Sequence, residues 1–289
     1  MKNDIIIIGG GPAGLACSLQ LKRYNVGSLI IEKDHLGGLM RNANKIENYL
    51  GFPKSISGVE LQEKFVQQIK QNNIKTEFDE VLKISHKKDE FTVTTIKNSF
   101  KSKLLVIASG TKPKKIPEVD IKKNALKSVF YEVFELLNIK NKKIAIIGAG
   151  DAAFDYALSL CKNNQVDIFN RGDKEKCLPL LYNKVSSEKN IHYHKHKILK
   201  SINKKQGRLS LIFNEQNKIC EHISNYIIFA VGRKPELSFL SEINENKIDS
   251  LVKNKTLFFI GDVKNGITRQ LAIATGDGIK TAMEIMLVA

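Results

Sequence analysis

Two short glycine-rich turns are the first candidates for a binding site in this sequence. Residues 9–14 read Gly-Gly-Gly-Pro-Ala-Gly, and residues 148–153 read Gly-Ala-Gly-Asp-Ala-Ala. Glycines allow the backbone to approach a pyrophosphate closely, and the N-terminus of a following helix attracts its negative charge. Each turn is therefore a candidate dinucleotide site.

A strand and a helix are expected on the two sides of each turn. Apolar strands are predicted over residues 4–8 and 143–147, and apolar residues recur at helical spacing after each turn. A strand, a glycine turn and a helix in this order open a Rossmann unit. We therefore expect an α/β fold with two Rossmann-like dinucleotide-binding domains.

The first unit has a carboxylate at the position that suits a ribose. Glu32 ends a second strand predicted over residues 28–31. A carboxylate there can accept hydrogen bonds from both hydroxyls of a ribose. The alternative is a structural turn followed by a glutamate that is there by chance.

The second unit has no acid at the equivalent position. Its second strand, predicted over residues 165–169, is followed by Asn170 and Arg171. Arg171 with Lys174 or Lys176 could bind a 2′-phosphate, which a carboxylate would repel. The pair of units thus suits one FAD and one NADPH. The alternative is an NADH site with unrelated surface charges.

Further strands and two hinges are expected around the second unit. Alternating residues predict antiparallel strands over residues 75–85, 91–95 and 104–108. Proline ends a strand cleanly, so the expected hinges are residues 111–113 (Thr-Lys-Pro) and 233–235 (Arg-Lys-Pro).

The last segment of the chain is too short to form a third domain. A strand over residues 256–260, a turn at Gly261-Asp262 and a helix from about Gln270 would complete the first sheet. We therefore expect an FAD-binding domain of residues 1–111 and 235–289. The NAD(P)H-binding domain, residues 112–234, is expected to be inserted in it.

The composition disfavours several classes of protein. The chain has 289 residues, of which 42% are hydrophobic and 26% charged, as in a globular protein of two domains. No apolar run approaches the ~20 residues of a membrane helix, and the first strand begins too early for a signal peptide. A cytoplasmic protein without membrane association is expected. The net charge of +16 suggests an acidic partner, but it comes mainly from scattered lysines with only six arginines, so nucleic-acid binding is not expected.

Neither the cysteines nor the histidines predict a site. Cys17 and Cys161 lie on the apolar faces of the two predicted helices, and Cys177 and Cys220 have no partner nearby in the sequence. Alternating histidines over residues 192–197 suit a strand with one polar face, and the lysines among them oppose a bound cation. We expect no metal site and no catalytic thiol.

The motifs together resemble the low-molecular-weight thioredoxin reductase-like flavoproteins over essentially the whole chain. The motifs that carry this resemblance are residues 9–14, Gly37-Gly38, residues 47–53 (Glu-Asn-Tyr-Leu-Gly-Phe-Pro), 108–110 (Ala-Ser-Gly), 148–150, 230–235 (Ala-Val-Gly-Arg-Lys-Pro), and Gly261-Asp262 followed by Arg269-Gln270. The resemblance implies FAD in the first domain, NADPH or NADH in the inserted one, and a homodimer.

The resemblance also implies roles for particular residues. Asp262 would hold the ribityl chain, Asn48 would lie near the isoalloxazine, and Gln270 would begin a helix that points at the ring and stabilises its reduced form. The residues implied for FAD are Gly9, Gly11, Pro12, Ala13, Gly14, Glu32, Lys33, Gly38, Leu39, Asn48, Ala108, Gly110, Gly261, Asp262, Arg269, Gln270 and Leu271. Those implied for NADP are Gly148, Gly150, Asp151, Ala152, Arg171, Lys176 and Gly232.

The sequence departs from this family at the residues that do its chemistry. The family's disulfide reductases have a redox C-x-x-C before the second glycine turn, and Tyr131 and Phe134 occupy that slot here. Neither side chain can take part in thiol–disulfide exchange. Smaller departures are Gly172, where a second arginine is expected, and Leu39, where the reductases usually have glutamine.

Three functions remain open. The main hypothesis is an FAD-dependent oxidoreductase that moves electrons from NADPH to a non-disulfide acceptor, an acidic carrier such as ferredoxin or flavodoxin. One alternative is a disulfide reductase that uses a dithiol supplied by a partner. The other is a flavin- and nucleotide-binding redox sensor without turnover. The sequence does not name the acceptor.

Overall fold

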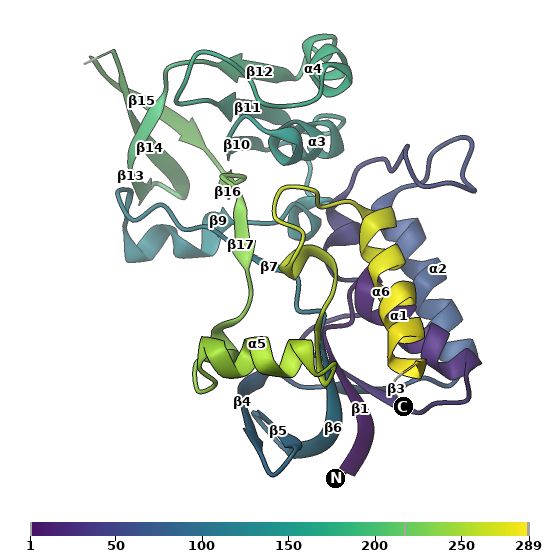
Figure 1. Cartoon of the computed structure of the whole chain (residues 1–289). Coiled ribbons are helices and arrows are strands. Elements are labelled where there is room, and N and C mark those ends of the chain that lie inside the picture. The colour runs from purple at the N-terminus through teal and green to yellow at the C-terminus, as the bar shows by residue number, and fades with distance from the viewer. Residues whose placement is uncertain (1, 217, 288–289) are drawn as a thin grey trace. The chain divides into compact units, whose positions relative to one another are not determined.

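The computed structural model describes residues 2–216 and 218–287, and the chain divides into two compact units (Figure 1). Unit 1 comprises Met1–Arg41, Glu47–Lys112 and Lys234–Ala289. Unit 2 comprises Asn42–Ile46 and Pro113–Arg233. The second unit is therefore inserted in the first, and a short segment after Arg41 groups with it.

A seven-stranded sheet forms the centre of unit 1. Its strands run in the order β3-β2-β1-β6-β5-β4, and β18 pairs with β6. The bounds are β1 Lys2–Ile8, β2 Ser28–Glu32, β3 Lys75–Phe78, β4 Val81–Lys87, β5 Glu90–Thr95, β6 Ser99–Ile107 and β18 Leu257–Phe259. Strand β18 returns from the end of the chain to this sheet, as expected.

The expectation of antiparallel strands after the first unit was partly wrong. Strand β3 lies parallel to β2, and β6 lies parallel to β1, whereas β4 and β5 are antiparallel. Alternation of polar and apolar residues reports that one face of a strand is buried, but it does not specify the direction of the neighbouring strand.

The second half of the central strand β1, Ile5–Ile8, is apolar because both of its faces are covered. Ile5 and Ile7 point to a core formed with α1 (Pro12–Arg23), α2 (Gly58–Gln71) and α6 (Leu271–Met286). Ile6 and Ile8 point to the opposite core, which includes Leu251 of α5 (Glu245–Lys253). Helices α1 and α6 cross closely: a Cβ at Gly278 would lie less than 3.0 Å from the Ala13 carbonyl oxygen.

Unit 2 contains a five-stranded parallel sheet in the order β12-β11-β10-β16-β9. The bounds are β9 Val129–Phe130, β10 Lys143–Ile147, β11 Gln165–Phe169, β12 Ile191–His194 and β16 Tyr226–Phe229. Helices α3 (Asp151–Leu160) and α4 (Pro179–Ser186) pack on the face that includes Ile144.

The other face of that sheet packs against a four-stranded sheet in the order β15-β14-β13-β8. The bounds are β8 Asp120–Ile121, β13 Ile198–Lys205, β14 Arg208–Glu215 and β15 Lys218–Ser224. Short 3-10 turns complete the chain at Gly38–Asn42, Lys123–Ser128, Phe134–Leu136, Ser238–Leu240 and Gly261–Val263.

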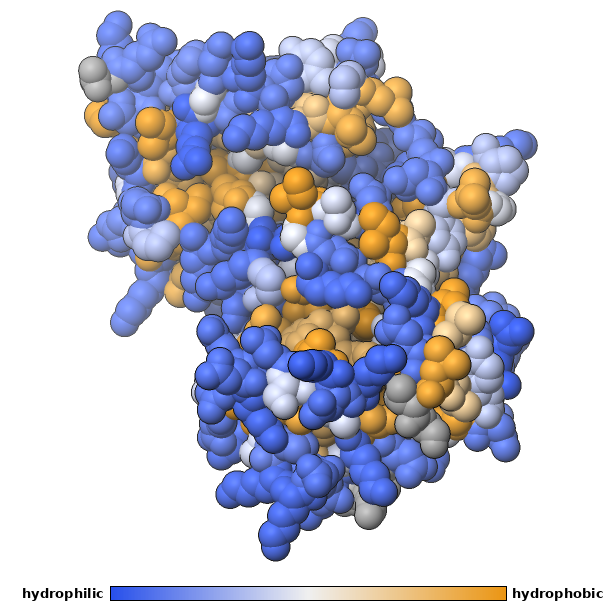
Figure 2. Space-filling view, viewed as in Figure 1, coloured by the Kyte–Doolittle hydropathy of each residue, from blue (hydrophilic) through white to orange (hydrophobic). Residues whose placement is uncertain are grey.

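The two connections between the units pair with each other. Strands β7 (Thr111–Pro113) and β17 (Arg233–Pro235) form a two-stranded ribbon at the positions predicted as hinges. No helix in the described ranges is long and apolar enough to cross a membrane. Hydrophilic side chains dominate the face of the molecule in Figure 2, in keeping with the lysine-rich composition.

Candidate dinucleotide sites

The first glycine turn packs tightly against the end of β6. Gly9 has a φ of 104°, and a Cβ there would lie less than 3.0 Å from the carbonyl oxygen of Ala108. A Cβ at Gly14 would collide in the same way with the carbonyl oxygen of Gly9. Any larger residue at either position would force the turn, the strand and α1 apart, so the first and last glycines of Gly-x-Gly-x-x-Gly have a local steric cause.

Gly11 faces open space at the start of α1. A Cβ added to it would meet no described atom within 4 Å, and none of the described side chains caps this helix N-terminus. Pro12 occupies the first helical turn, so the free N–H groups that remain point toward this space. An uncapped helix N-terminus beside an empty glycine surface fits a dinucleotide pyrophosphate.

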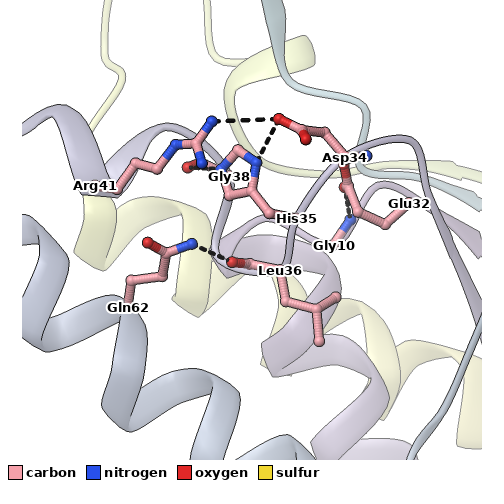
Figure 3. Close-up of polar contacts among 8 residues, drawn as sticks. All are labelled: Gly10, Glu32, Asp34, His35, Leu36, Gly38, Arg41 and Gln62. Carbon is pink, nitrogen blue, oxygen red and sulfur yellow. Dashed lines mark hydrogen bonds and ion pairs between the residues drawn. The ribbon is translucent and has the colours of Figure 1, made fainter. Parts of the chain in front are cut away.

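The carboxylate of Glu32 lies against the same turn (Figure 3). Its Oε2 accepts a hydrogen bond from the N–H of Gly10 at 2.6 Å, and its Oε1 accepts one from the N–H of Asp34 at 3.0 Å. Each carboxylate oxygen has a second lone pair. The side chain is therefore fixed at the end of β2 and can still accept hydrogen bonds from ribose hydroxyls.

A polar network that the sequence analysis missed holds the loop after β2 (Figure 3). His35 lies 2.6 Å from Asp34 Oδ2 through Nδ1 and 3.0 Å from the Gly38 carbonyl through Nε2, and Arg41 pairs with Asp34 at 3.2 Å. Gln62 of α2 donates to the Leu36 carbonyl at 2.5 Å. Burial raises the pKa of Asp34, but His35 and Arg41 outweigh it and lower the pKa. The network fixes Gly38, whose Cβ would lie 3.2 Å from Gly11 Cα.

The end of the chain brings further predicted residues to the first turn. Gly261 has a φ of 71°, and its Cβ would lie 2.8 Å from the Cβ of Ala13. Asn48 donates to Oε1 of Gln270 at 3.0 Å, and Gln270 is the N-cap residue of α6. These contacts bring Gly261 next to Ala13 and Asn48 next to Gln270 within unit 1, although the two residues of each pair are more than 200 positions apart in the chain.

The remaining residues implied for FAD lie beside these in the sequence. Lys33 is exposed, Leu39 is 36% exposed, and Gly110 has a φ of 63° and accepts from the Glu236 N–H at 3.1 Å. Asp262, Arg269 and Leu271 are half-buried. Their positions are compatible with a flavin at this end of the unit.

The second glycine turn repeats the steric arrangement of the first. Gly148 has a φ of 136°, and its Cβ would lie less than 3.0 Å from the carbonyl oxygen of Ala230. Gly150 is the N-cap residue of α3, and its Cβ would meet no described atom within 4 Å. Asp151 follows it and accepts a hydrogen bond from the Leu178 N–H at 2.7 Å, and Ala152 is exposed. This turn therefore also fits a pyrophosphate.

The loop after β11 is shaped by Asn170, which the sequence analysis did not single out as a site residue. Its buried side chain donates to the Lys174 carbonyl at 3.0 Å and to the Tyr193 hydroxyl at 2.8 Å, and accepts from the Gly172 N–H at 3.0 Å. Arg171 and Lys176 are both exposed. The Lys176 N–H bonds the Ala149 carbonyl at 2.7 Å, which keeps the loop beside the glycine turn. Two cations are thus available there for a 2′-phosphate.

The segment that replaces the redox C-x-x-C, residues 131–134, packs within unit 2 through Tyr131 and Val133. The Tyr131 ring stacks on Phe229 with centroids 5.7 Å apart, and Val133 is fully buried. Between them, Glu132 accepts a hydrogen bond from the Tyr156 hydroxyl at 3.0 Å and forms an ion pair with Arg233. The segment therefore has packing and ionic contacts in place of a dithiol.

The cysteines lack the properties of a redox pair. All four are free thiols, and Cys17 and Cys161 are buried. Burial raises the pKa of Cys17 to about 12 and also raises the pKa values of Cys161 and Cys177. Thiolates are the reactive species, so burial suppresses reactivity at these positions. Among the described residues, no group of three or more possible ligands could hold a metal ion.

One histidine of the predicted polar strand belongs to a half-buried ionic cluster. His194 Nε2 lies 2.6 Å from Asp167 Oδ1, and His222 Nε2 lies 3.4 Å from Asp167 Oδ2. The ring of Phe169 stacks on His194 with centroids 4.8 Å apart. The cluster joins the two sheets of unit 2, and we assign it a structural role.

Comparisons with known proteins agree with this geometry. The family model described as pyridine nucleotide-disulphide oxidoreductase matches residues 3–278. The thioredoxin reductase of Bacillus subtilis is 27% identical over 295 residues, which cover 98% of this chain and 93% of that protein. The structure of Lactococcus lactis thioredoxin reductase superposes with a TM-score of 0.89 and 26% sequence identity. The match covers 99% of this chain and 98% of the Lactococcus lactis chain. A bacillithiol disulfide reductase from Staphylococcus aureus shares the fold, with a TM-score of 0.80 and 20% sequence identity. The match covers 100% of this chain and 99% of the Staphylococcus aureus chain.

Proposed function

The chain belongs to the pyridine nucleotide-disulphide oxidoreductase family, and we propose that it passes electrons from NADPH through FAD directly to an external acceptor. The resemblance and the fold class expected from the sequence are confirmed: the chain has the thioredoxin reductase fold with two Rossmann-like domains. It is an FAD- and NAD(P)H-dependent oxidoreductase of the thioredoxin reductase type.

The residues of unit 1 are proposed to hold the FAD. The Gly11 surface and the N-terminus of α1 would bind the pyrophosphate, and Glu32 would accept the ribose hydroxyls of the adenosine. Gln270 at the start of α6 would present a helix N-terminus to the flavin, which favours a negative charge there. Bound FAD would accept a hydride from NADPH and supply two electrons to the acceptor.

The residues of unit 2 are proposed to select NADPH. Gly150 and the N-terminus of α3 would bind the pyrophosphate of the coenzyme, and Arg171 with Lys176 would bind its 2′-phosphate. The side chain of Asn170 holds this loop in shape before the coenzyme arrives. NADH lacks the phosphate and would lose these charged contacts.

The single observation that carries the proposal is that Tyr131 and Phe134 stand at the position of the dithiol, in a segment that packs within unit 2 through Tyr131 and Val133. The four thiols lie elsewhere in the sequence, and two of them are buried. This chain therefore offers no dithiol at the slot that carries the relay in its relatives, and the acceptor must react at the flavin itself.

Two classes of acceptor fit this arrangement. The family model is described as pyridine nucleotide-disulphide oxidoreductase and the relatives are named thioredoxin reductase, so the comparisons favour the disulfide alternative over the acidic carrier that we expected first. We propose a disulfide that docks directly at the flavin; two electrons and two protons would cleave its S–S bond to two thiols. An acidic carrier protein is the second candidate, because the net charge is +16 and unit 2 contains 23 of the 46 basic residues but only 12 of the 30 acidic ones.

An anaerobic experiment tests this proposal in two stages. NADPH is first added to the FAD-loaded protein while the flavin absorbance is followed; stoichiometric bleaching supports the electron path, and an unchanged spectrum would mean a redox sensor. The reduced protein is then mixed with thioredoxin disulfide, a low-molecular-weight disulfide, or an oxidised ferredoxin or flavodoxin. Rapid reoxidation by a disulfide supports the first candidate, and reoxidation only by a carrier protein would replace it with the second.

The oligomeric state is also a proposal. We infer a homodimer from the family relationship, and light scattering during size-exclusion chromatography measures the mass against the 32.5 kDa of one chain. A mass of one chain at micromolar concentration would contradict it.

A further inference from the structure

Glu132 occupies a particular place in the parallel sheet of unit 2. It lies two residues after β9, and β9 pairs parallel with β16, which ends at Phe229. Residues that follow parallel strands emerge at the same edge of the sheet. Glu132 therefore lies at the edge where residues 230–233 follow β16.

That edge is where a dinucleotide binds in an open parallel sheet. The second glycine turn follows β10, the strand next to β16, and Gly148 packs directly against the carbonyl of Ala230. Gly232 has a φ of 97°, so the backbone turns sharply just before Arg233. The segment from Ala230 to Arg233 thus forms one wall beside the turn that would bind the coenzyme.

Glu132 ties this wall to the helix that begins at the glycine turn. One carboxylate oxygen accepts a hydrogen bond from Tyr156 of α3 at 3.0 Å, and the other pairs with the guanidinium of Arg233. The side chains of Glu132 and Arg233 are only 22% and 23% exposed, and Tyr156 is 8% exposed. Burial and the nearby carboxylate raise the pKa of Tyr156, so its hydroxyl keeps its proton and acts as the donor.

We propose that Glu132 is a positioning residue for the nicotinamide coenzyme, which fixes the Ala230–Arg233 wall through its contacts with Arg233 and Tyr156. The inference rests on the proposed function in one respect, namely that unit 2 binds NADP(H). The segment 131–134, which contains the redox cysteines in the family's disulfide reductases, would here fix the geometry of the coenzyme site.

The test measures coenzyme binding and not turnover alone. NADP⁺ is titrated into the FAD-loaded Glu132→Gln protein by isothermal calorimetry, because glutamine keeps the shape but loses the charge that pairs with Arg233. We expect the dissociation constant to rise about tenfold, and the limiting rate of flavin reduction at saturating NADPH to stay within about threefold of the parent rate.

Two further variants keep the result interpretable. Glu118→Gln removes an exposed carboxylate from the same unit and should leave the dissociation constant unchanged. The double variant Glu132→Gln/Arg233→Met should bind no more weakly than the weaker single variant, because both changes break the same ion pair. An unchanged dissociation constant in Glu132→Gln, or additive losses in the double variant, would overturn the inference.

This design separates failure of the inference from failure of the proposed function. If NADP⁺ binds the parent protein but the flavin is never reduced, the electron path is wrong and the binding comparison still decides the role of Glu132. If NADP⁺ and NAD⁺ both fail to bind the parent protein, both proposals are overturned.

Discussion

Substituting Gly11 with alanine should remove FAD without unfolding the protein. The added Cβ would meet no described atom within 4 Å, so the apoprotein has room for it. Gly11 has φ −74° and ψ −180°, an extended conformation that alanine adopts easily. The space that the methyl group fills is the space proposed for the pyrophosphate.

The expected changes in thermal stability and in FAD affinity follow from what surrounds Gly11 in the apoprotein and in the FAD complex. Alanine is a poorer N-cap residue than glycine by several tenths of a kcal/mol, but it restricts the unfolded chain by about 0.4–1 kcal/mol, so the two effects nearly cancel. The apoprotein should therefore melt within about 2 °C of the parent. A methyl group between the backbone and a phosphate would break one or two charge-assisted hydrogen bonds, about 3 kcal/mol together, which is roughly a 150-fold weaker affinity.

Gly14→Ala provides the contrasting control. Its Cβ would lie less than 3.0 Å from the Gly9 carbonyl oxygen, 3.2 Å from Ile7 Cγ2 and 3.3 Å from Ala108 Cβ. Relief requires α1 to move away from the sheet, a form of overpacking that costs about 1–3 kcal/mol. This variant should lose both thermal stability, by about 3–10 °C, and FAD affinity.

Thermal melting of the two apoproteins and titration with FAD by quenching of flavin fluorescence measure both quantities. Native FAD affinity in Gly11→Ala would refute the assignment of this turn to the pyrophosphate. A large drop in its melting temperature would instead show that the turn is occupied by protein atoms in solution.

Three further outcomes are expected. The double variant Cys177→Ser/Cys220→Ser should retain NADPH-driven turnover within about twofold, and a loss of more than tenfold would reinstate a thiol in the electron path. Arg171→Ala should weaken NADPH binding about 10- to 100-fold, the equivalent of roughly 1.5–3 kcal/mol, and leave NADH binding unchanged; equal losses for both coenzymes would contradict a 2′-phosphate contact. Burial alone would raise the pKa of Asp167, but hydrogen bonds from His194 and His222 outweigh it and hold the pKa below its ordinary value. The stabilisation from ionised Asp167 is therefore present at neutral pH and is lost as the pH falls below about 4. Asp167→Asn should lower the free energy of unfolding by about 2 kcal/mol at pH 7 and by less at pH 3.5, as measured by urea titration. A difference that does not depend on pH would argue against this ionic role.

Local features of the sequence predicted much of this fold. Gly9, Gly14 and Gly148 pack on backbone carbonyls and a side chain there would collide, so these glycines follow from local sterics. Ile5–Ile8 are all apolar because both faces of β1 are buried, and this predicts a central strand directly. Glu32 was recognisable because it lies a fixed distance along the same βαβ unit.

Contacts between distant residues could not be predicted in the same way. The partner of Glu132 is Arg233, 101 positions away, and neither residue type nor spacing specifies that pair. The network of Asp34, His35 and Arg41 contains no motif, although its clustering of charged residues beside Gly37-Gly38 is a signal that could have been followed. Strand directions around β3 and β6 depend on the whole sheet, and alternation within one segment does not report them.

The packed aromatic and ionic slot has a consequence for how this protein would withstand chemical stress. Enzymes that relay electrons through an exposed dithiol are inactivated by peroxides, alkylating agents and soft metal ions, because these attack the thiolate. Here Tyr131, Val133 and Phe134 offer no nucleophile, and burial keeps the thiols of Cys17 and Cys161 protonated. Reductive activity should therefore persist under oxidising or electrophilic conditions that silence its dithiol-dependent relatives.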